Sequence, residues 1–191
     1  MTTTWKTTLT CLLTALLAGC AGIPLSAMPR LMSLQKQLLD LDPAQFMLAI
    51  QTDARMPTPG EVPVLELAIR PREPGAFEPV DKKLPLRFAP FPGGARGLEP
   101  APAGRRWLVY SIPPESQAEL VAVQNYFRKL QGEKPKGGGS VAIGISQAGM
   151  PATDPALADT KWESWLQTSH REGFYEIWSG PVSTLLQQGK P

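Results

Sequence analysis

The hexapeptide WLVYSI, residues 107–112, carries large apolar side chains at both alternating sets of positions. A strand with one face in water alternates apolar and polar residues, so an apolar run without alternation is typical of a strand covered on both faces. We therefore predict a central strand here. The adjoining segment 114–131 repeats apolar residues at helical spacing and predicts an amphipathic helix. Its apolar stripe consists of Leu120, Val123, Phe127 and Leu130.

Six other segments alternate in side-chain character with a period of two, the pattern of half-buried strands. They are residues 46–51, 64–70, 84–88, 141–146, 162–168 and 174–178. The last two flank a turn at 170–173, and this arrangement predicts a C-terminal hairpin. We expect a mainly β fold, a single β-sandwich-like domain of about seven short strands with one inserted helix at 114–131. An α+β arrangement is the alternative.

Proline is unusually frequent, at 21 of 191 residues, which is roughly twice its ordinary usage. Because proline interrupts helix interiors and donates no hydrogen bond to a sheet, this composition excludes long helical bundles and favours short elements. Near the amino terminus, Leu31, Leu34, Leu38 and Leu41 recur at a spacing that permits either a short amphipathic helix or an irregular first strand.

The first 19 residues have the three parts of a secretory signal, namely a polar start with one charge at Lys6, an apolar run, and the small residues Ala18 and Gly19. The apolar run is too short to span a bilayer, which takes roughly 20 apolar residues. A cysteine, Cys20, follows directly. We therefore predict a signal peptide at 1–19, and a buried helix is the alternative.

Leu17-Ala18-Gly19-Cys20 resembles the lipobox of bacterial lipoproteins. The resemblance implies that a diacylglyceryl group is attached to the sulfur of Cys20, that lipoprotein signal peptidase cuts before this residue, and that the new amino terminus is acylated. Two or more acyl chains give a stable membrane anchor, whereas one does not. Ala21 stands where an Asp would imply retention at the inner membrane, so the resemblance favours the outer membrane, with the domain facing the periplasm.

The chain is accordingly expected to consist of a signal peptide at 1–19, a lipidated tether at 20–30 and a single globular β-rich domain at 31–191. Loss of the signal removes one lysine and no acid, so the formal charge falls from +2 to +1. This balance gives no reason to expect nucleic acid as a partner. Residues 168–174 (TSHREGF) resemble a short sequence segment of uncharacterised proteobacterial envelope lipoproteins, and this resemblance implies no activity.

Few residues of the sequence are suited to catalysis. The chain has one histidine, His170, and its two cysteines are Cys11 in the signal and the lipidation site Cys20. A Ser-His-Asp triad and a zinc site both need more than these residues offer. We therefore predict no catalytic residue, no metal site and no cofactor. Carboxylate pairs such as Asp40 and Asp42 make a carboxylate-based hydrolase an alternative.

Five aromatic residues crowd into the seventeen residues from Trp162 to Trp178. They could form a surface that stacks against sugar rings or a partner's apolar face, or they could fill the core of the sandwich. Alternation places Trp162 and Trp165 on opposite faces of one strand, so both cannot point inward. The candidate ligand or partner surface consists of Trp162, Trp165, Tyr175 and Trp178.

The sequence as a whole predicts a lipid-anchored cell-envelope protein that acts as a non-enzymatic interaction or structural module. Its expected partners are the membrane, through the lipid at Cys20, and another envelope protein. The alternative function is a glycan- or lipid-binding module that uses the C-terminal aromatic cluster.

Replacing Cys20 by alanine removes the sulfur to which the lipid would be attached. We expect the intact mass of the membrane-extracted protein to equal the chain without residues 1–19 plus acyl chains, and the Cys20→Ala variant to lack the added mass. Mass spectrometry of both proteins checks this, and an unmodified mature chain in the soluble fraction would contradict the anchor.

Overall fold

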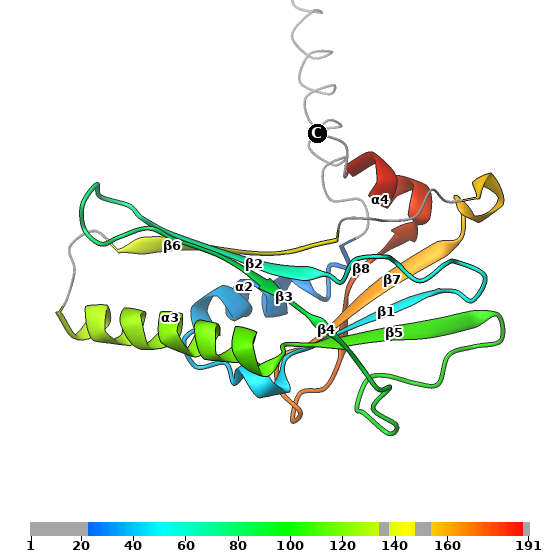
Figure 1. Cartoon of the computed structure of the whole chain (residues 1–191), viewed down its shortest axis with the longest axis horizontal. Coiled ribbons are helices and arrows are strands. Elements are labelled where there is room, and N and C mark those ends of the chain that lie inside the picture. The colour runs from blue at the N-terminus through cyan, green and yellow to red at the C-terminus, as the bar shows by residue number, and fades with distance from the viewer. Residues whose placement is uncertain (1–22, 134–137, 148–153, 189–191) are drawn as a thin grey trace, which may run out of the picture.

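The computed structural model describes residues 23–133, 138–147 and 154–188. Within them, eight strands form two antiparallel sheets, and the predicted mainly β fold is confirmed (Figure 1). Sheet A has the strand order β4 (Arg87–Ala89), β5 (Arg105–Ser111), β1 (Met47–Asp53), β7 (Lys161–Gln167) and β8 (Tyr175–Pro181). Sheet B has the order β3 (Val80–Pro85), β2 (Val64–Pro71) and β6 (Gly139–Ser146). The predicted central strand is β5, which lies between two neighbours, and the predicted hairpin is formed by β7 and β8.

The inner faces of the two sheets contribute to one hydrophobic core, as in a sandwich. Leu48 and Ile50 of β1 and Tyr110 of β5 belong to the same buried cluster as Leu65 and Leu67 of β2. Along β1 and β2, alternate residues enter this cluster, as the period of two requires. The core therefore lies between the sheets and holds them together.

One continuous segment joins the sheets along one side. Strand β3, at the edge of sheet B, ends at Pro85, and β4, at the edge of sheet A, begins at Arg87, with only Leu86 between them. Leu84 and Leu86 are both buried. The prediction of one strand at 84–88 is therefore wrong, and the described residues contain eight strands. A proline donates no hydrogen bond to a strand ladder, so the pairing of β3 ends there.

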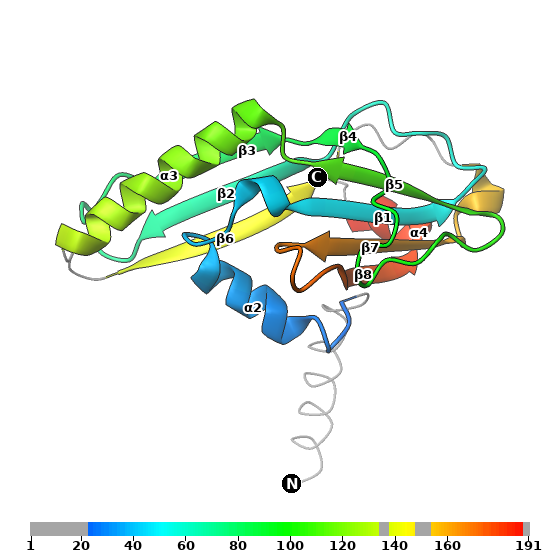
Figure 2. The same cartoon turned by 90° about the horizontal axis from the view of Figure 1, so that it is seen from below.

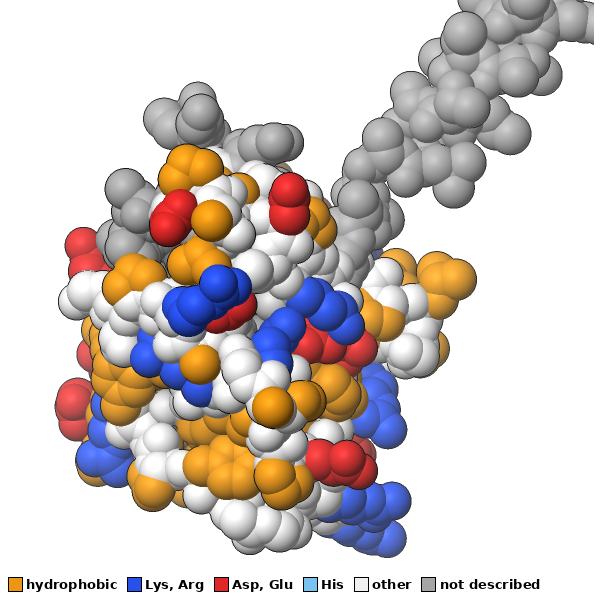
Figure 3. Space-filling view, turned by 90° about the vertical axis from the view of Figure 1, so that its right-hand side faces the viewer, with side chains coloured by type: hydrophobic (Ala, Val, Ile, Leu, Met, Phe, Trp, Pro, Cys, Tyr) orange, Lys and Arg blue, Asp and Glu red, His pale blue; other side chains and the backbone are white. Residues whose placement is uncertain are grey.

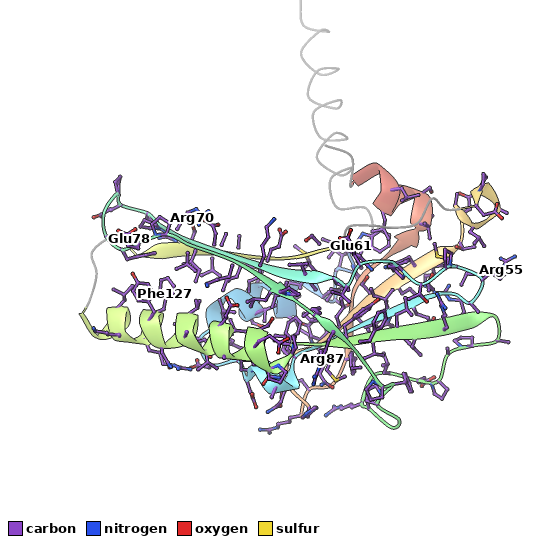
Figure 4. The ribbon with its side chains drawn as sticks, viewed as in Figure 1. Arg55, Glu61, Arg70, Glu78, Arg87 and Phe127 are labelled. Atoms are coloured by element: carbon purple, nitrogen blue, oxygen red, sulfur yellow. The ribbon has the colours of Figure 1, made fainter. Side chains whose placement is uncertain are left out.

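The helix α3 (Pro114–Glu133) lies under the part of sheet B that extends past sheet A (Figure 1). It is the predicted inserted helix, and Leu120, Val123 and Phe127 of its stripe are buried. Phe127 points from α3 toward sheet B (Figure 4), where its ring meets that of Phe77 edge to face with 5.3 Å between the centroids. The helix thus closes the portion of the core that sheet A does not cover.

Two other α-helices accompany α3, and one of them lies in a segment where the sequence permitted either a helix or a strand. Residues 31–41 are helical up to Gln37, as part of α2 (Met28–Gln37), so the strand alternative for this segment is wrong. Because α2 begins at Met28 and Ala27 is buried, the folded domain starts within the expected tether 20–30. The helix α4 (Val182–Gln188) follows β8 directly. It has two turns at most, too few for the apolar period to reveal it.

The loop 90–104 covers the outer face of sheet A. Leu98 of this loop forms a second buried cluster with Ala49, Val109 and Phe174. Figure 3 views the molecule from the right-hand side of Figure 1, and hydrophobic side chains gather in the lower part of that view. Sheet A is therefore covered on both faces, which accounts for the apolar residues on both faces of β5.

The same loop crosses the β7–β8 turn at very short range. Gly97 and Gly173 have φ angles of +81° and +77°, and the amide of Phe174 donates to the carbonyl oxygen of Arg96 at 2.8 Å. A Cβ at Gly97 would lie 2.2 Å from the carbonyl oxygen of Phe174, and one at Gly173 would lie 2.4 Å from that of Arg96. Glycine is therefore required at both positions, for its φ and for the space.

A comparison of Gly97→Ala with Gly104→Ala separates the cost of a side chain at positive φ from the cost of its clash with neighbouring backbone. Gly104 has a φ of +75°, but no atom lies within 4 Å of the place of its Cβ. We expect Gly104→Ala to lower the free energy of unfolding by about 1–2 kcal/mol, the cost of a Cβ in the left-handed region. Gly97→Ala should cost considerably more, because backbone must also move. Urea denaturation of both variants measures the difference, and equal losses would contradict the crossing.

Candidate functional site

On the side opposite the β3–β4 link, no described strand joins the two sheets. Strands β6 and β8 are the outer strands of sheets B and A, and no described strand pairs with the free edge of either. A cleft of about 940 Å³ reaches from this side into the space between the sheets. Figure 2 shows α2 beside these two edges, and both α2 and α4 contribute residues to the cleft.

None of the described residues that line the cleft is charged. Its polar side chains, apart from two indoles, are Ser146, Gln147 and Ser164. All remaining lining residues except Gly144 are apolar and come from both sheets, both helices and the segments beside them. They are Ile23, Leu31, Leu34, Phe46, Leu48, Ile50, Leu65, Ile143, Ile145, Trp162, Leu166, Ile177, Trp178, Leu185 and Leu186.

A β-bulge in β8 places two successive side chains on the cleft. Ser164 of β7 is paired with Trp178, whereas the next residue, Trp165, is paired with Glu176, so Ile177 is an extra residue without a direct partner. Successive residues of a regular strand point to opposite faces, but a bulge breaks this alternation. Ile177 and Trp178 therefore both line the cleft.

The ring of Trp178 lies over Gly180 of the same strand. A Cβ at Gly180 would come within 2.9 Å of the far end of this ring. The absence of a side chain at position 180 thus leaves room for the indole to lie along the wall of the cleft.

Trp162 forms part of the floor of the cleft. Its side chain is almost fully buried, and its indole N–H donates to the hydroxyl oxygen of Ser164 at 3.2 Å. Ser164 itself faces Ile50 across the pairing of β7 and β1. The serine therefore supplies the polar group that a buried indole requires while adding little bulk to the wall.

A smaller, polar pocket of about 240 Å³ lies on the other flank of α2, and Leu34 lines both cavities. The guanidinium of Arg30 lies over the Tyr175 ring, 4.9 Å from its centroid. Burial raises the pKa of the Tyr175 hydroxyl. The pKa of Asp42 is lowered, first by the Gln45 side-chain amide and then by the Ala44 amide, which both donate to its carboxylate. This pocket is therefore lined by fixed polar groups.

The structure divides the predicted aromatic surface among three places. Trp162 and Trp178 line the cleft, and Tyr175 lines the polar pocket. Trp165 lies on the outer face of sheet A with the cluster beneath the loop 90–104. The predicted lipidation site and its recognition sequence lie outside the described residues. These are Leu17, Ala18, Gly19 and Cys20.

The residues of the cleft that sequence reasoning missed come from segments far from the aromatic cluster. Ile143 and Ile145 belong to β6, and Leu185 and Leu186 belong to α4. Alternation identifies Ile143 and Ile145 as inward-facing, but no local signal indicates that β6 is an edge strand opposite β8. Only the three-dimensional pairing brings these walls together.

The described residues contain no group of three or more His, Cys, Asp or Glu side chains placed to hold a metal ion. His170 lies in the β7–β8 turn, with its Nδ1 3.1 Å from the Gln167 amide nitrogen. Among the helices of the described part, none is long and apolar enough to cross a membrane.

No protein-family model matches the chain, and no curated protein or solved structure is significantly similar to it.

Replacing Ser164 by alanine would leave the buried Trp162 indole N–H without its acceptor. We expect the free energy of unfolding to fall by about 1–3 kcal/mol, the cost of a buried donor that loses its partner. Ser164→Thr is the matched control, because it keeps a hydroxyl at the same position. Urea denaturation followed by tryptophan emission measures both. Equal stability of the alanine and threonine variants would contradict the role assigned to this hydrogen bond.

Proposed function

We propose that the chain is a lipid-anchored envelope protein whose cleft binds an extended apolar chain, such as the acyl chain of a lipid. The observation that carries the proposal is a cleft of about 940 Å³ whose described lining is uncharged and which no described strand closes between β6 and β8. Binding sites for small molecules typically have volumes of about 300–1,000 Å³ and mostly apolar walls. The volume and the lining of this cleft both support such a ligand.

The energetics of burial also favour an acyl chain. Each methylene group moved from water into an apolar environment contributes about 0.8 kcal/mol. A segment of about ten methylenes would thus gain about 8 kcal/mol, which corresponds to micromolar affinity before the cost of ordering the ligand. The open side allows such a chain to enter sideways, without unfolding either sheet.

A glycan is less well suited to the same cleft. Sugar hydroxyls lose hydrogen bonds to water on binding and need polar partners in return. The described lining offers three polar side chains besides the indoles, and all three already take part in a hydrogen bond. Ser146 donates to the Glu66 carboxylate, Gln147 donates to the carbonyl oxygen of Glu61, and Ser164 accepts from Trp162. Trp162 is 4% exposed, so its ring face does not form an open stacking platform. Of the two ligands that the sequence left as alternatives, a glycan and a lipid, these observations support the lipid.

Filling the cleft tests the proposal. Ile145→Trp adds bulk to the inner face of β6, whereas Ala142→Trp adds the same side chain to the exposed outer face of the same strand. We expect dodecanoate to displace the fluorescent probe 1-anilinonaphthalene-8-sulfonate from the parent protein and from Ala142→Trp. Ile145→Trp should bind dodecanoate about tenfold more weakly, a loss of about 1.4 kcal/mol.

The measurement is made on the Cys20→Ala background, so that no acyl chain attached at Cys20 competes with the probe. Urea denaturation of each variant shows whether its fold is retained. Equal affinities in the folded Ile145→Trp and Ala142→Trp variants, or no binding by the parent, would contradict the proposal.

A further inference from the structure

Exposed apolar side chains are concentrated just before and within α2. Four of the eight large hydrophobic side chains exposed in the described residues lie between positions 23 and 32. They are Ile23, Leu25, Met28 and Met32, exposed by 36%, 88%, 40% and 63%, and we call them the N-terminal apolar face. Monomeric proteins rarely expose apolar side chains in such a cluster unless the cluster contacts another surface.

This face is distinct from the face of α2 that packs on the core. Ala27, Leu34 and Leu38 are buried. Met28 and Met32 are one turn apart and share a different face of the helix. Leu25 precedes the helix by about one turn and lies on the same side as these two residues. The helix therefore has two apolar sides, and packing within the described part of the chain accounts for only one of them.

The charge of the segment suits an anionic surface. Residues 1–39 contain no Asp or Glu, and the first acid of the chain is Asp40. Within the segment that contains α2, the charged residues are Lys36 and Arg30, and the guanidinium of Arg30 lies over the Tyr175 ring at the polar pocket. A helical segment that exposes apolar side chains and contains basic residues but no acids is typical of helices that lie in the interface of a membrane.

The face also adjoins the mouth of the cleft and the predicted anchor. Ile23 belongs to the face and lines the cleft, and Leu31 of α2 lines it as well. Leu25 is five residues from Cys20, a distance of at most about 18 Å in extended chain. A lipid at Cys20 would thus keep this face within reach of the bilayer.

We propose that the N-terminal apolar face lies in the headgroup region of a lipid bilayer, so that the mouth of the cleft opens at the membrane surface. The second half of this statement rests on the proposed function, because it assigns the ligand to the membrane. An acyl chain could then pass between bilayer and cleft without crossing water.

The test places an environment-sensitive fluorophore on the face. Leu25→Cys and Met32→Cys are labelled with a nitrobenzoxadiazole maleimide in the full chain, and Val121→Cys on α3, 39% exposed, is the matched control. The proteins are reconstituted with vesicles of phosphatidylethanolamine and phosphatidylglycerol whose acyl chains carry bromine. The unsubstituted chain, treated in the same way, corrects for any labelling of Cys11 or Cys20.

We expect a blue shift and a loss of fluorescence for the labels at positions 25 and 32, and neither change for the label at position 121. Unquenched labels at 25 and 32, or equal quenching at all three positions, would overturn the proposal. Labels that stay unquenched in vesicles but are protected in cells would also overturn it and indicate a protein partner.

A second pair of variants separates this proposal from the function of the cleft. The double variant Leu25→Asp, Met32→Asp changes exposed positions only. We therefore expect it to bind dodecanoate with unchanged affinity. Its contact with the bilayer, measured by the quenching of a fluorophore at Met28→Cys, should be lost. The Ile145→Trp variant should bind dodecanoate more weakly and keep its contact with the bilayer. A bilayer contact that survives the two aspartates would overturn the docking face, whatever the result for the cleft.

Discussion

The segment from Val80 to Ala89 belongs to both sheets, and this constraint determines where the molecule is closed and where it is open. Because only Leu86 separates β3 from β4, the edges of the two sheets are held together on one side. The short distance allows no spacer there, and the buried side chains of Leu84 and Leu86 seal that side against water. Sheets joined along one edge can separate only along the other, between β6 and β8. The cleft is thus a consequence of the connection.

The remaining elements stabilise this arrangement by covering what the sheets leave exposed. The connection between α2 and β1 is held from two directions by buried glutamines. Gln124 of α3 donates to the carbonyl oxygens of Leu38 and Leu41, both at 2.8 Å, and Gln167 of β7 donates to that of Gln45 at 3.0 Å. Buried carbonyls need such partners. α2 is therefore fixed beside the open edges, where it forms one rim of the cleft.

Much of the secondary structure could be predicted because hydrophobic periodicity is a local property. The stripe of α3 and the alternation in β2 and β6 reflect one buried face each, and the sequence shows it directly. The end of β3 at Pro85 could not be predicted, because Leu84, Leu86 and Phe88 continue the period of two across it although the chain passes from one sheet to the other there. Periodicity records which side chains are buried but not which sheet buries them.

The candidate site was predictable only in part, for the same reason. The density of aromatic residues indicated Trp162 and Trp178, and alternation separated Trp162 from Trp165. The bulge at Ile177 depends on pairing between β7 and β8 and leaves no mark in the local pattern. The opposite wall comes from β6 and α4, and their approach to β8 is decided by the whole fold.

The crossing of Gly97 and Gly173 also constrains how the sequence can diverge. Each backbone occupies the space that a side chain on the other would need, so the two positions form a single requirement although they lie far apart in the chain. In any lineage that retains the loop over sheet A, both glycines are expected to persist together. Where the loop is shortened or lost, selection on both is released at once, and the two positions should then vary as a pair.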